Sequence, residues 1–242
     1  MCACVRACVR AMERRDGGAF VAIYDLETQD LIARAPGQTR DEKVASLQLS
    51  CCSVLCVPSE FAMKPEMAER AMETAKMHTF WRDGEGDKSV ASMIRMFDNA
   101  ELIVGFNLVG FDWLVLKKHY LDKLQYIRHR EKTHDIFSRI RDVTGVWYKL
   151  DNLLKLNNLG QKTANGFAAI TMWERGERDD LQLYCESDTR QTARLGLLKS
   201  VDVGMGLFIE NNSFGIASAL ASKRFSASLF DVYVTDAVAQ NP

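Results

Sequence analysis

Strand-like patterns dominate the first half of the chain, and helical patterns dominate the second half. Runs of apolar, β-branched and aromatic residues predict strands over 19–26, 44–57 and 101–106. Apolar residues at helical spacing predict helices over 88–97, 111–120, 150–157, 167–175 and 179–199. Because strands and helices are interleaved, the predicted fold class is α/β, with a sheet and helices in layers.

The composition shifts at both ends of this patterned region. Residues 1–17 are rich in arginine and cysteine and are expected to form a loose N-terminal extension. Residues 18–200 are expected to form the folded domain. Residues 201–242, rich in Gly, Ala and Ser, are expected to form a C-terminal hairpin or tail, with a hairpin over 207–216 that turns at Asn211 and Asn212.

The overall composition is that of an ordinary globular protein. A length of 242 residues predicts one or two domains, and 47% hydrophobic with 26% charged residues exclude wholesale disorder. No apolar run approaches the roughly 18 residues of a membrane-spanning helix, so no membrane contact is expected. A net charge of -1 excludes a protein that holds nucleic acid by a broad basic surface. Any contact with nucleic acid must therefore be made through a local site.

Cysteine usage favours a reducing compartment. Seven cysteines, an odd number in a chain large enough for its own core, argue against a disulfide framework. Cys51, Cys52 and Cys56 lie in an apolar run without a C-x2-C pair, so we expect buried small hydrophobic residues. Because Arg6 and Arg10 interrupt the apolar part of any secretion signal, an intracellular location is expected, with import into an organelle left open.

Two acids end the first predicted strand two residues apart. Asp25 and Glu27 project from the same face as Val21 and Ile23, because side chains in a strand alternate with a period of two. Two carboxylates ~4 Å apart repel by about 4 kcal/mol at an effective dielectric of ~20. Solvent, a shared proton or a divalent cation must offset that repulsion. Taken alone, the pair is more typical of a solvated strand end than of a metal site.

Two further acids occur in apolar surroundings. Asp112 follows a buried strand and a glycine turn, and alone it is typical of an acid in the first turn of a helix. Asp188 lies within the inward stripe of the long helix, where an acid is destabilising unless it is paired or coordinated. No basic residue lies three or four positions after Asp188, and Tyr184 lies one turn before it. The other members of the stripe are Leu181, Thr192 and Leu195.

The joint pattern of these acids resembles the DEDD superfamily of 3'-5' exonucleases. The matching motifs are DLET at 25–28, IVGFNLVGFDWLVL at 103–116 and LYCESDTRQT at 183–192. The last two are most similar to those of the proofreading domains of family-B DNA polymerases and their free-standing exonuclease relatives. The resemblance covers about residues 19–199, and it implies a ribonuclease H-like fold with a central mixed β-sheet flanked by α-helices.

One position assigns the subtype within this resemblance. The histidine variant has its histidine five residues before the last aspartate, where this chain has Leu183. Tyr184 instead fits the tyrosine variant, DEDDy. We therefore expect no histidine to act as the general base, and at most a minor role for His134 in the strand-like segment THDIF.

The resemblance implies a catalytic site with two divalent cations, Mg2+ or Mn2+. Its implied residues are Asp25, Glu27, Asp112, Tyr184 and Asp188. In this assignment Asp25, Glu27 and Asp188 hold one cation, Asp25 and Asp112 hold the other, and Tyr184 orients the attacking water. Oxygen ligands suit hard cations, and a pair of cations roughly 3.5–4 Å apart stabilises both the attacking and the leaving oxygen of a phosphodiester.

Contacts to nucleic acid are expected around these acids, and each has a structural alternative. The expected contacts are Leu26, Thr28, Asn107, Phe111 and Lys162. Leu26 and Phe111 are equally suited to the core, Asn107 to a turn and Lys162 to a solvent-facing loop, and Thr28 flanks the first two acids. The segment 117–132 contains six Lys/Arg, which predict either a phosphate track or a solvated helix face.

We therefore expect residues 18–200 to be a DEDDy exonuclease domain that removes nucleotides from the 3' ends of single-stranded nucleic acid. DNA is favoured over RNA because the motifs resemble those of polymerases, and a helicase or polymerase partner would compensate for the missing basic surface. Two alternatives stay open. One is a catalytically inactive nucleic-acid-binding or assembly module on the same fold, and the other is an endonuclease of the ribonuclease H type.

Overall fold

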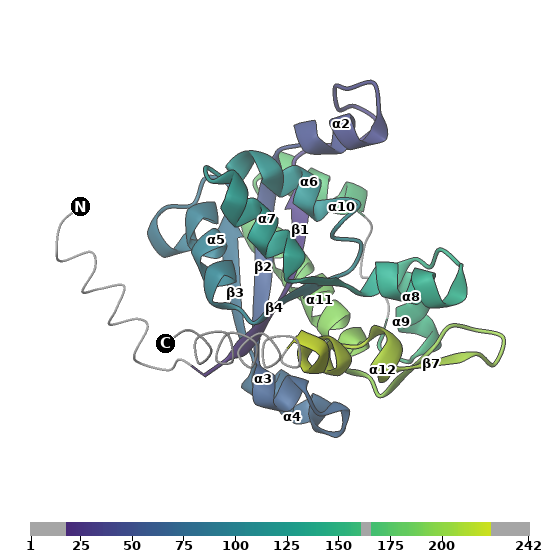
Figure 1. The fold of residues 1–242 in the computed structure, drawn as a ribbon. Helices are drawn as coiled ribbons and strands as arrows, with labels where there is room; N and C mark the ends of the chain where they lie inside the picture. The colour runs from purple at the N-terminus through teal and green to yellow at the C-terminus, as the bar shows by residue number, and fades with distance from the viewer. Residues whose placement is uncertain (1–17, 161–165, 224–242) are drawn as a thin grey trace, which may run out of the picture.

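A five-stranded mixed β-sheet forms the centre of the protein (Figure 1). The computed structural model describes residues 18–160 and 166–223, so the arginine-rich segment 1–17 and the end of the predicted tail, 224–242, lie outside it. The strand order is β3-β2-β1-β4-β5. The strands are β1 (Phe20–Thr28), β2 (Leu49–Pro58), β3 (Lys76–Trp81), β4 (Leu102–Gly105) and β5 (Thr133–Asp135).

The directions of the strands bring three carboxyl ends to one edge of the sheet. β2 is antiparallel to β1 and to β3, whereas β4 is parallel to both β1 and β5. This mixed sheet, flanked by helices, confirms the predicted α/β class and is consistent with a ribonuclease H-like fold. The ends of β1, β4 and β5 therefore meet at the same edge, where polar side chains from distant parts of the chain can converge.

Three helices cover one face of the sheet, and their packing is dominated by aromatic rings. They are α5 (Val90–Asn99), α6 (Asp112–Leu116) and α7 (Lys123–Glu131). Tyr24 of β1 packs against Phe97 at 5.1 Å and Trp113 at 5.9 Å between ring centroids. All three side chains are fully buried. This layer holds the start of α6, which carries Asp112, against the sheet.

The long helix α11 (Arg178–Leu197) packs on the opposite face of the sheet, where the core also receives residues from α4 (Ala68–Thr74), α8 (Ile136–Thr144), α9 (Leu150–Leu156) and α12 (Asn211–Phe214). Val21 and Ile23 of β1 belong to the same core cluster as Leu195 of α11. A side chain at Gly196 would lie 2.8 Å from the Ile136 side chain, so the glycine leaves room for that side chain against α11.

The sequence predicts one strand over the apolar run 44–57, and this prediction is wrong. The run contains the end of a helix followed by β2. Helix α2 (Arg40–Ser46) begins at a capping box in which Thr39 and Glu42 satisfy each other's backbone N–H groups. The helix that begins at this cap ends at Ser46, inside the apolar run. The remaining short elements are α3 (Ser59–Ala62), α10 (Gly166–Arg175) and the 3-10 turns η1 (Pro65–Met67), η2 (Gly86–Lys88) and η3 (Lys117–His119).

The C-terminal hairpin lies earlier in the chain than 207–216. It consists of β6 (Ser200–Asp202) and β7 (Phe208–Glu210), which are antiparallel. Gly204 and Gly206 supply the left-handed backbone of its turn, with φ of 94° and 75°. Asn211 begins α12 instead of a turn, and its side-chain amide donates to the carbonyl of Leu198 at 2.6 Å.

The cysteines in the described residues carry free thiols. Cys51 and Cys52 are completely buried, as expected for small hydrophobic residues, and Cys56 is partly exposed. Across residues 18–160 and 166–223, none of the helices combines the length and the apolar character needed to cross a membrane.

Candidate metal centre and active site

Asp25 and Glu27 lie at the end of β1 on the face that packs against α11. Strand alternation places them on the side of Val21 and Ile23, as the sequence predicts, whereas Leu26 points into the aromatic core on the other face. Both acids are partly exposed, while their neighbours in β1 are buried. The strand thus ends with two carboxylates directed toward the long helix.

Helix α11 brings Tyr184 and Asp188 to these carboxylates. Two hydrogen bonds align the helix along the sheet: the Cys185 thiol donates to the carbonyl of Asp25 at 3.5 Å, and the Thr189 hydroxyl donates to the carbonyl of Ser53 at 3.3 Å. Asp188 is only 1% exposed. The predicted inward stripe of α11 is confirmed, because all its members are buried.

The carboxylates of Asp25, Glu27 and Asp188 form one cluster, in which the candidate ligand oxygens all lie within 4.8 Å of one another. Two oxygens on opposite sides of Mg2+, each at 2.0–2.1 Å, are about 4.2 Å apart. A small side-chain movement therefore brings all three carboxylates onto one hard cation. An all-oxygen set fits Mg2+ or Mn2+ rather than a metal that prefers sulfur or nitrogen. The residues present fit the implied metal.

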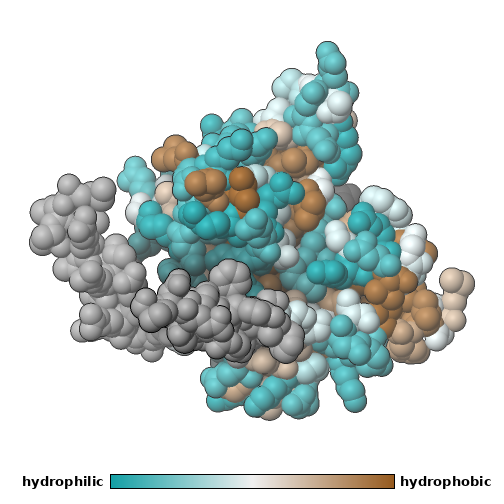
Figure 2. All heavy atoms as spheres, in the orientation of Figure 1, coloured by the Kyte–Doolittle hydropathy of each residue, from teal (hydrophilic) through white to brown (hydrophobic). Residues whose placement is uncertain are grey.

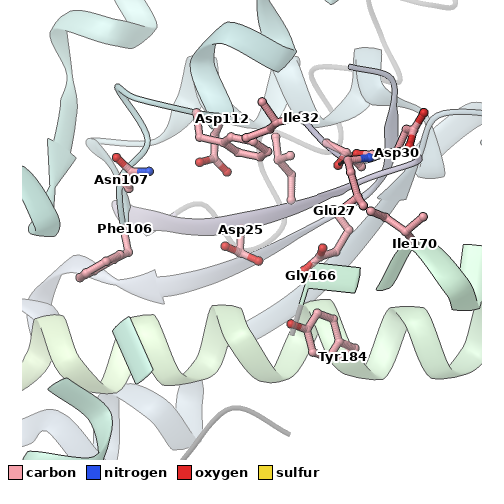
Figure 3. A pocket seen from close by; sticks show the side chains of 14 residues that line it. Asp25, Glu27, Asp30, Ile32, Phe106, Asn107, Asp112, Gly166, Ile170 and Tyr184 are labelled. Atoms are coloured by element: carbon pink, nitrogen blue, oxygen red, sulfur yellow. Dashed lines mark hydrogen bonds between the residues drawn. The ribbon is translucent and has the colours of Figure 1, made fainter. Parts of the chain in front are cut away.

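Asp112 lies at the edge of the same pocket, outside the three-residue cluster. It is the first residue of α6 and is 4% exposed. The turn that leads to it begins at Gly105, where a side chain would lie 2.8 Å from the Tyr24 carbonyl, and passes through Asn107 in the left-handed conformation, with φ of 64°. In Figure 3, Asp112 lies above the strand from which Asp25 points toward α11.

The phenol of Tyr184 is a proton donor at neutral pH. Burial raises its pKa well above 10, and the nearby charges of Glu27, Asp188 and Asp25 raise it further. The hydroxyl also donates a hydrogen bond to the Asp188 carboxylate, which favours the protonated phenol. Figure 3 shows this hydroxyl facing Asp25 and Glu27 across the space between strand and helix.

These groups open into a pocket of about 290 Å³. It is lined by four of the predicted substrate contacts: Leu26, Thr28, Asn107 and Phe111. Leu26 is mostly a core residue at 4% exposure, and the Thr28 hydroxyl donates to the carbonyl of Asp30 at 3.1 Å. The fifth, Lys162, lies outside the described residues. The sequence did not single out six further lining residues: Asp30, Leu31, Ile32, Phe106, Gly166 and Ile170.

The basic segment 117–132 has largely structural contacts. Lys118 donates to the carbonyls of Ser46 and Leu47, and Lys132 donates to the carbonyls of Asp98 and Ala100. These two ammonium groups bind carbonyls at the ends of α2 and α5. The described residues that line the pocket include no histidine. His134 is 4% exposed, and its Nε2 lies 2.6 Å from the carbonyl of Phe214, a structural position.

Asp135 positions the turn that carries the second motif, a role that the sequence did not reveal. It ends β5, and its carboxylate accepts hydrogen bonds from the backbone N–H of Asn107 at 2.8 Å and of Val109 at 3.1 Å. The Ser138 hydroxyl donates to the same carboxylate at 3.2 Å. The sequence signal that could have indicated this role is the position of an acid at the end of a strand, which is also the position of Asp25.

The substitution Asp135→Asn is expected to lower the free energy of unfolding by about 2–3 kcal/mol. An amide can accept only one of the two backbone N–H groups, and hydrogen bonds to a charged group contribute about 1.5–3 kcal/mol each. Urea denaturation measures the effect. Ser138→Ala removes one bond to the same carboxylate but leaves both backbone bonds in place, and the hydroxyl that it removes is partly exposed, so a smaller cost of about 1 kcal/mol is expected. Equal losses in the two variants would contradict this role.

Known solved structures show distant similarity to this chain. No known protein-family model matches the sequence, and no curated protein is significantly similar to it. Among solved structures, the chain is similar to a family B DNA polymerase from the hyperthermophilic archaeon Pyrobaculum calidifontis, with a TM-score of 0.48 and 15% sequence identity. The match covers 74% of this chain and 24% of the polymerase, so the chain spans about a quarter of that protein. A similarity this low says nothing of activity.

Proposed function

We propose that this protein is a metal-dependent 3'-5' exonuclease that hydrolyses the terminal phosphodiester of single-stranded nucleic acid. The observation that supports it best is the convergence of Asp25, Glu27 and Asp188 from two elements about 160 positions apart. A cluster of like charges that serves no ligand would be expected to disperse into solvent, since the repulsion between such groups amounts to several kcal/mol. Here one of them is almost completely buried.

The chain's own residues define the chemistry. Asp25, Glu27 and Asp188 would hold one divalent cation, and Asp25 with Asp112 would hold a second beside the scissile phosphate. Bound there, the cations would supply a hydroxide nucleophile at neutral pH and neutralise the charge that develops on the leaving oxygen. Tyr184 keeps its proton, and its hydroxyl would orient the attacking water by hydrogen bonding.

The pocket suits the end of a strand rather than its middle. A volume of about 290 Å³ is at the low end for a small-molecule site, which suits one terminal nucleotide. Phe111 and Ile32 offer apolar surface for a base, and Asn107 offers an amide. This arrangement supports release of single nucleotides over cleavage within a strand.

Binding of Mn2+ is expected to stabilise the protein through the acidic cluster. At a concentration of 100 times Kd, the free energy of unfolding rises by about 2.7 kcal/mol, which for a domain of this size raises Tm by roughly 5–10 °C. Scanning calorimetry measures the shift. In Asp188→Asn most of it should vanish, because one of the three ligands loses its charge. An equal shift in both proteins would place the metal elsewhere.

The test of the proposed activity uses 5'-labelled single strands of DNA and RNA with Mg2+ or Mn2+. Stepwise shortening by the wild-type protein, absent from Asp188→Asn, is the expected result, and the relative rates decide between DNA and RNA. Binding without shortening under either metal would indicate an inactive module, and internal cuts would indicate an endonuclease. Either result would overturn the proposal.

A further inference from the structure

Three aromatic side chains form a continuous row that leads away from the pocket, here called the aromatic row: Phe106, Phe137 and Trp147. Phe106 lines the pocket beside Asn107. Its ring contacts Phe137 of α8 at 5.5 Å between centroids, and Phe137 contacts Trp147 at 5.2 Å. The row thus runs from the candidate active site to the loop after α8.

The outer end of the row is exposed. Trp147 is 71% exposed, whereas Phe137 beneath it is 8% exposed. The guanidinium of Arg141 lies over both rings, 5.9 Å from the centroid of Phe137 and 5.3 Å from that of Trp147. It also approaches Asp142 at 3.2 Å, an exposed pair of little energetic weight. Phe137 therefore anchors a large ring that is held in place by a cation and presented to solvent.

This combination matches the chemistry of a single strand of nucleic acid. Aromatic rings stack on bases of any sequence, and arginine adds attraction to the same bases and to phosphate. We propose that the aromatic row binds the nucleotides upstream of the 3' end, with Trp147 as the stacking platform. This inference rests on the proposed function, because it uses the pocket as the place where the 3' end lies.

Two observations favour nucleic acid over a protein as the occupant. The row shares Phe106 with the pocket, so a strand whose end lies at the acids passes directly onto it. Arg141 and the exposed Lys149 supply positive charge on both sides of Trp147 in the sequence. Val143 and Val146, near Trp147 in the sequence, are also exposed. Figure 2 shows an apolar patch in the neighbouring region of α9 and β7. A protein partner is therefore the alternative outcome of the test.

The spacing of the rings predicts which nucleotide reaches Trp147. A stacked strand rises about 3.4 Å per nucleotide. The two ring-to-ring steps of 5.5 and 5.2 Å therefore place Trp147 at most about three nucleotides from Phe106. A dinucleotide in the pocket would not touch Trp147, whereas a strand of eight nucleotides would.

The test compares binding of thymidine oligonucleotides of two and eight nucleotides by fluorescence anisotropy, with Ca2+ in place of Mg2+. Trp147→Leu is expected to weaken binding of the longer strand about tenfold and to leave the shorter one unchanged. Trp147→Phe, which keeps a stacking ring, should restore most of the affinity. Phe208→Leu is the matched control, since Phe208 is another exposed ring at 59%, outside the aromatic row, and should bind both lengths as the wild type does.

Unchanged binding of the eight-nucleotide strand by Trp147→Leu, or an equal loss at both lengths, would overturn the inference and favour a protein partner for this surface. The same variants assayed for strand shortening separate the two proposals. If the wild type shortens the strand but Trp147→Leu binds both lengths as the wild type does, the proposed binding of nucleotides by the aromatic row is refuted and the exonuclease proposal is not. Absence of both shortening and binding in the wild type refutes the exonuclease as well.

Discussion

The substitution Asp25→Asn is expected to lower the rate of nucleotide release by about a thousandfold or more. Asp25 is the residue that both cations would share, and the cations are worth several kcal/mol of transition-state stabilisation. A loss of about 4 kcal/mol corresponds to a factor of roughly a thousand in rate. The amide has the shape of the carboxylate, so the change removes charge and leaves the packing in place.

The fold should survive this substitution. The backbone carbonyl of Asp25, which accepts from Cys185, is unaffected, and removing one of three clustered charges relieves repulsion in the metal-free protein. Quench-flow or gel assays measure the rate, and the urea midpoint controls for folding. Asp30→Asn provides a comparison, because Asp30 lines the same pocket outside the cluster and pairs with Arg34 at 3.5 Å. We expect a loss below about tenfold there, and comparable losses in both variants would contradict the assigned metal site.

The substitution Tyr184→Phe is expected to lower kcat about a hundredfold with little change in substrate affinity. Loss of a positioned group that handles a proton or orients a water in the transition state typically costs 10²–10⁴-fold, and Tyr184 is assigned the milder of these roles. Because the pKa of the phenol lies well above 10, the tyrosine keeps its proton throughout the range from pH 6 to 9. The wild type and the variant should therefore have pH–rate profiles of the same shape.

Single-turnover kinetics separate the hydrolytic step from binding. Tyr126→Phe is the matched control, since Tyr126 is also buried and donates its hydroxyl to the carbonyl of Trp113 at 2.9 Å, within the aromatic core. It should lose about 1 kcal/mol of stability and retain kcat. Equal losses in binding and turnover for Tyr184→Phe would show that the phenol holds the substrate rather than the water.

Local periodicity was sufficient to predict which way the acids face. A period of two placed Asp25 and Glu27 on one side of β1, and the stripe on α11 placed Asp188 inward. The sequence contains no local signal for the meeting of strand and helix. That depends on Thr189 donating to the backbone of Ser53, a contact across 136 positions. The expectation that the acids of strand and helix meet came from the resemblance to the DEDD superfamily.

Other features could not be predicted because their causes are not periodic. The apolar run alone indicates a strand, but a capping box just before it begins helix α2, which extends into the run. Asp135 acts on backbone N–H groups of another loop, so nothing in its own neighbourhood distinguishes it from a helix cap. Trp147 lies in a loop, where exposure is decided by what α8 places beneath it.

The long separation between β1 and α11 has a consequence for how the protein is made. The acidic cluster needs both Asp25, near the start of the chain, and Asp188, which leaves the ribosome after some 160 further residues. Contacts between such distant segments form late and slowly. On a nascent chain the cluster therefore cannot form until the segment that carries Asp188 has left the ribosome.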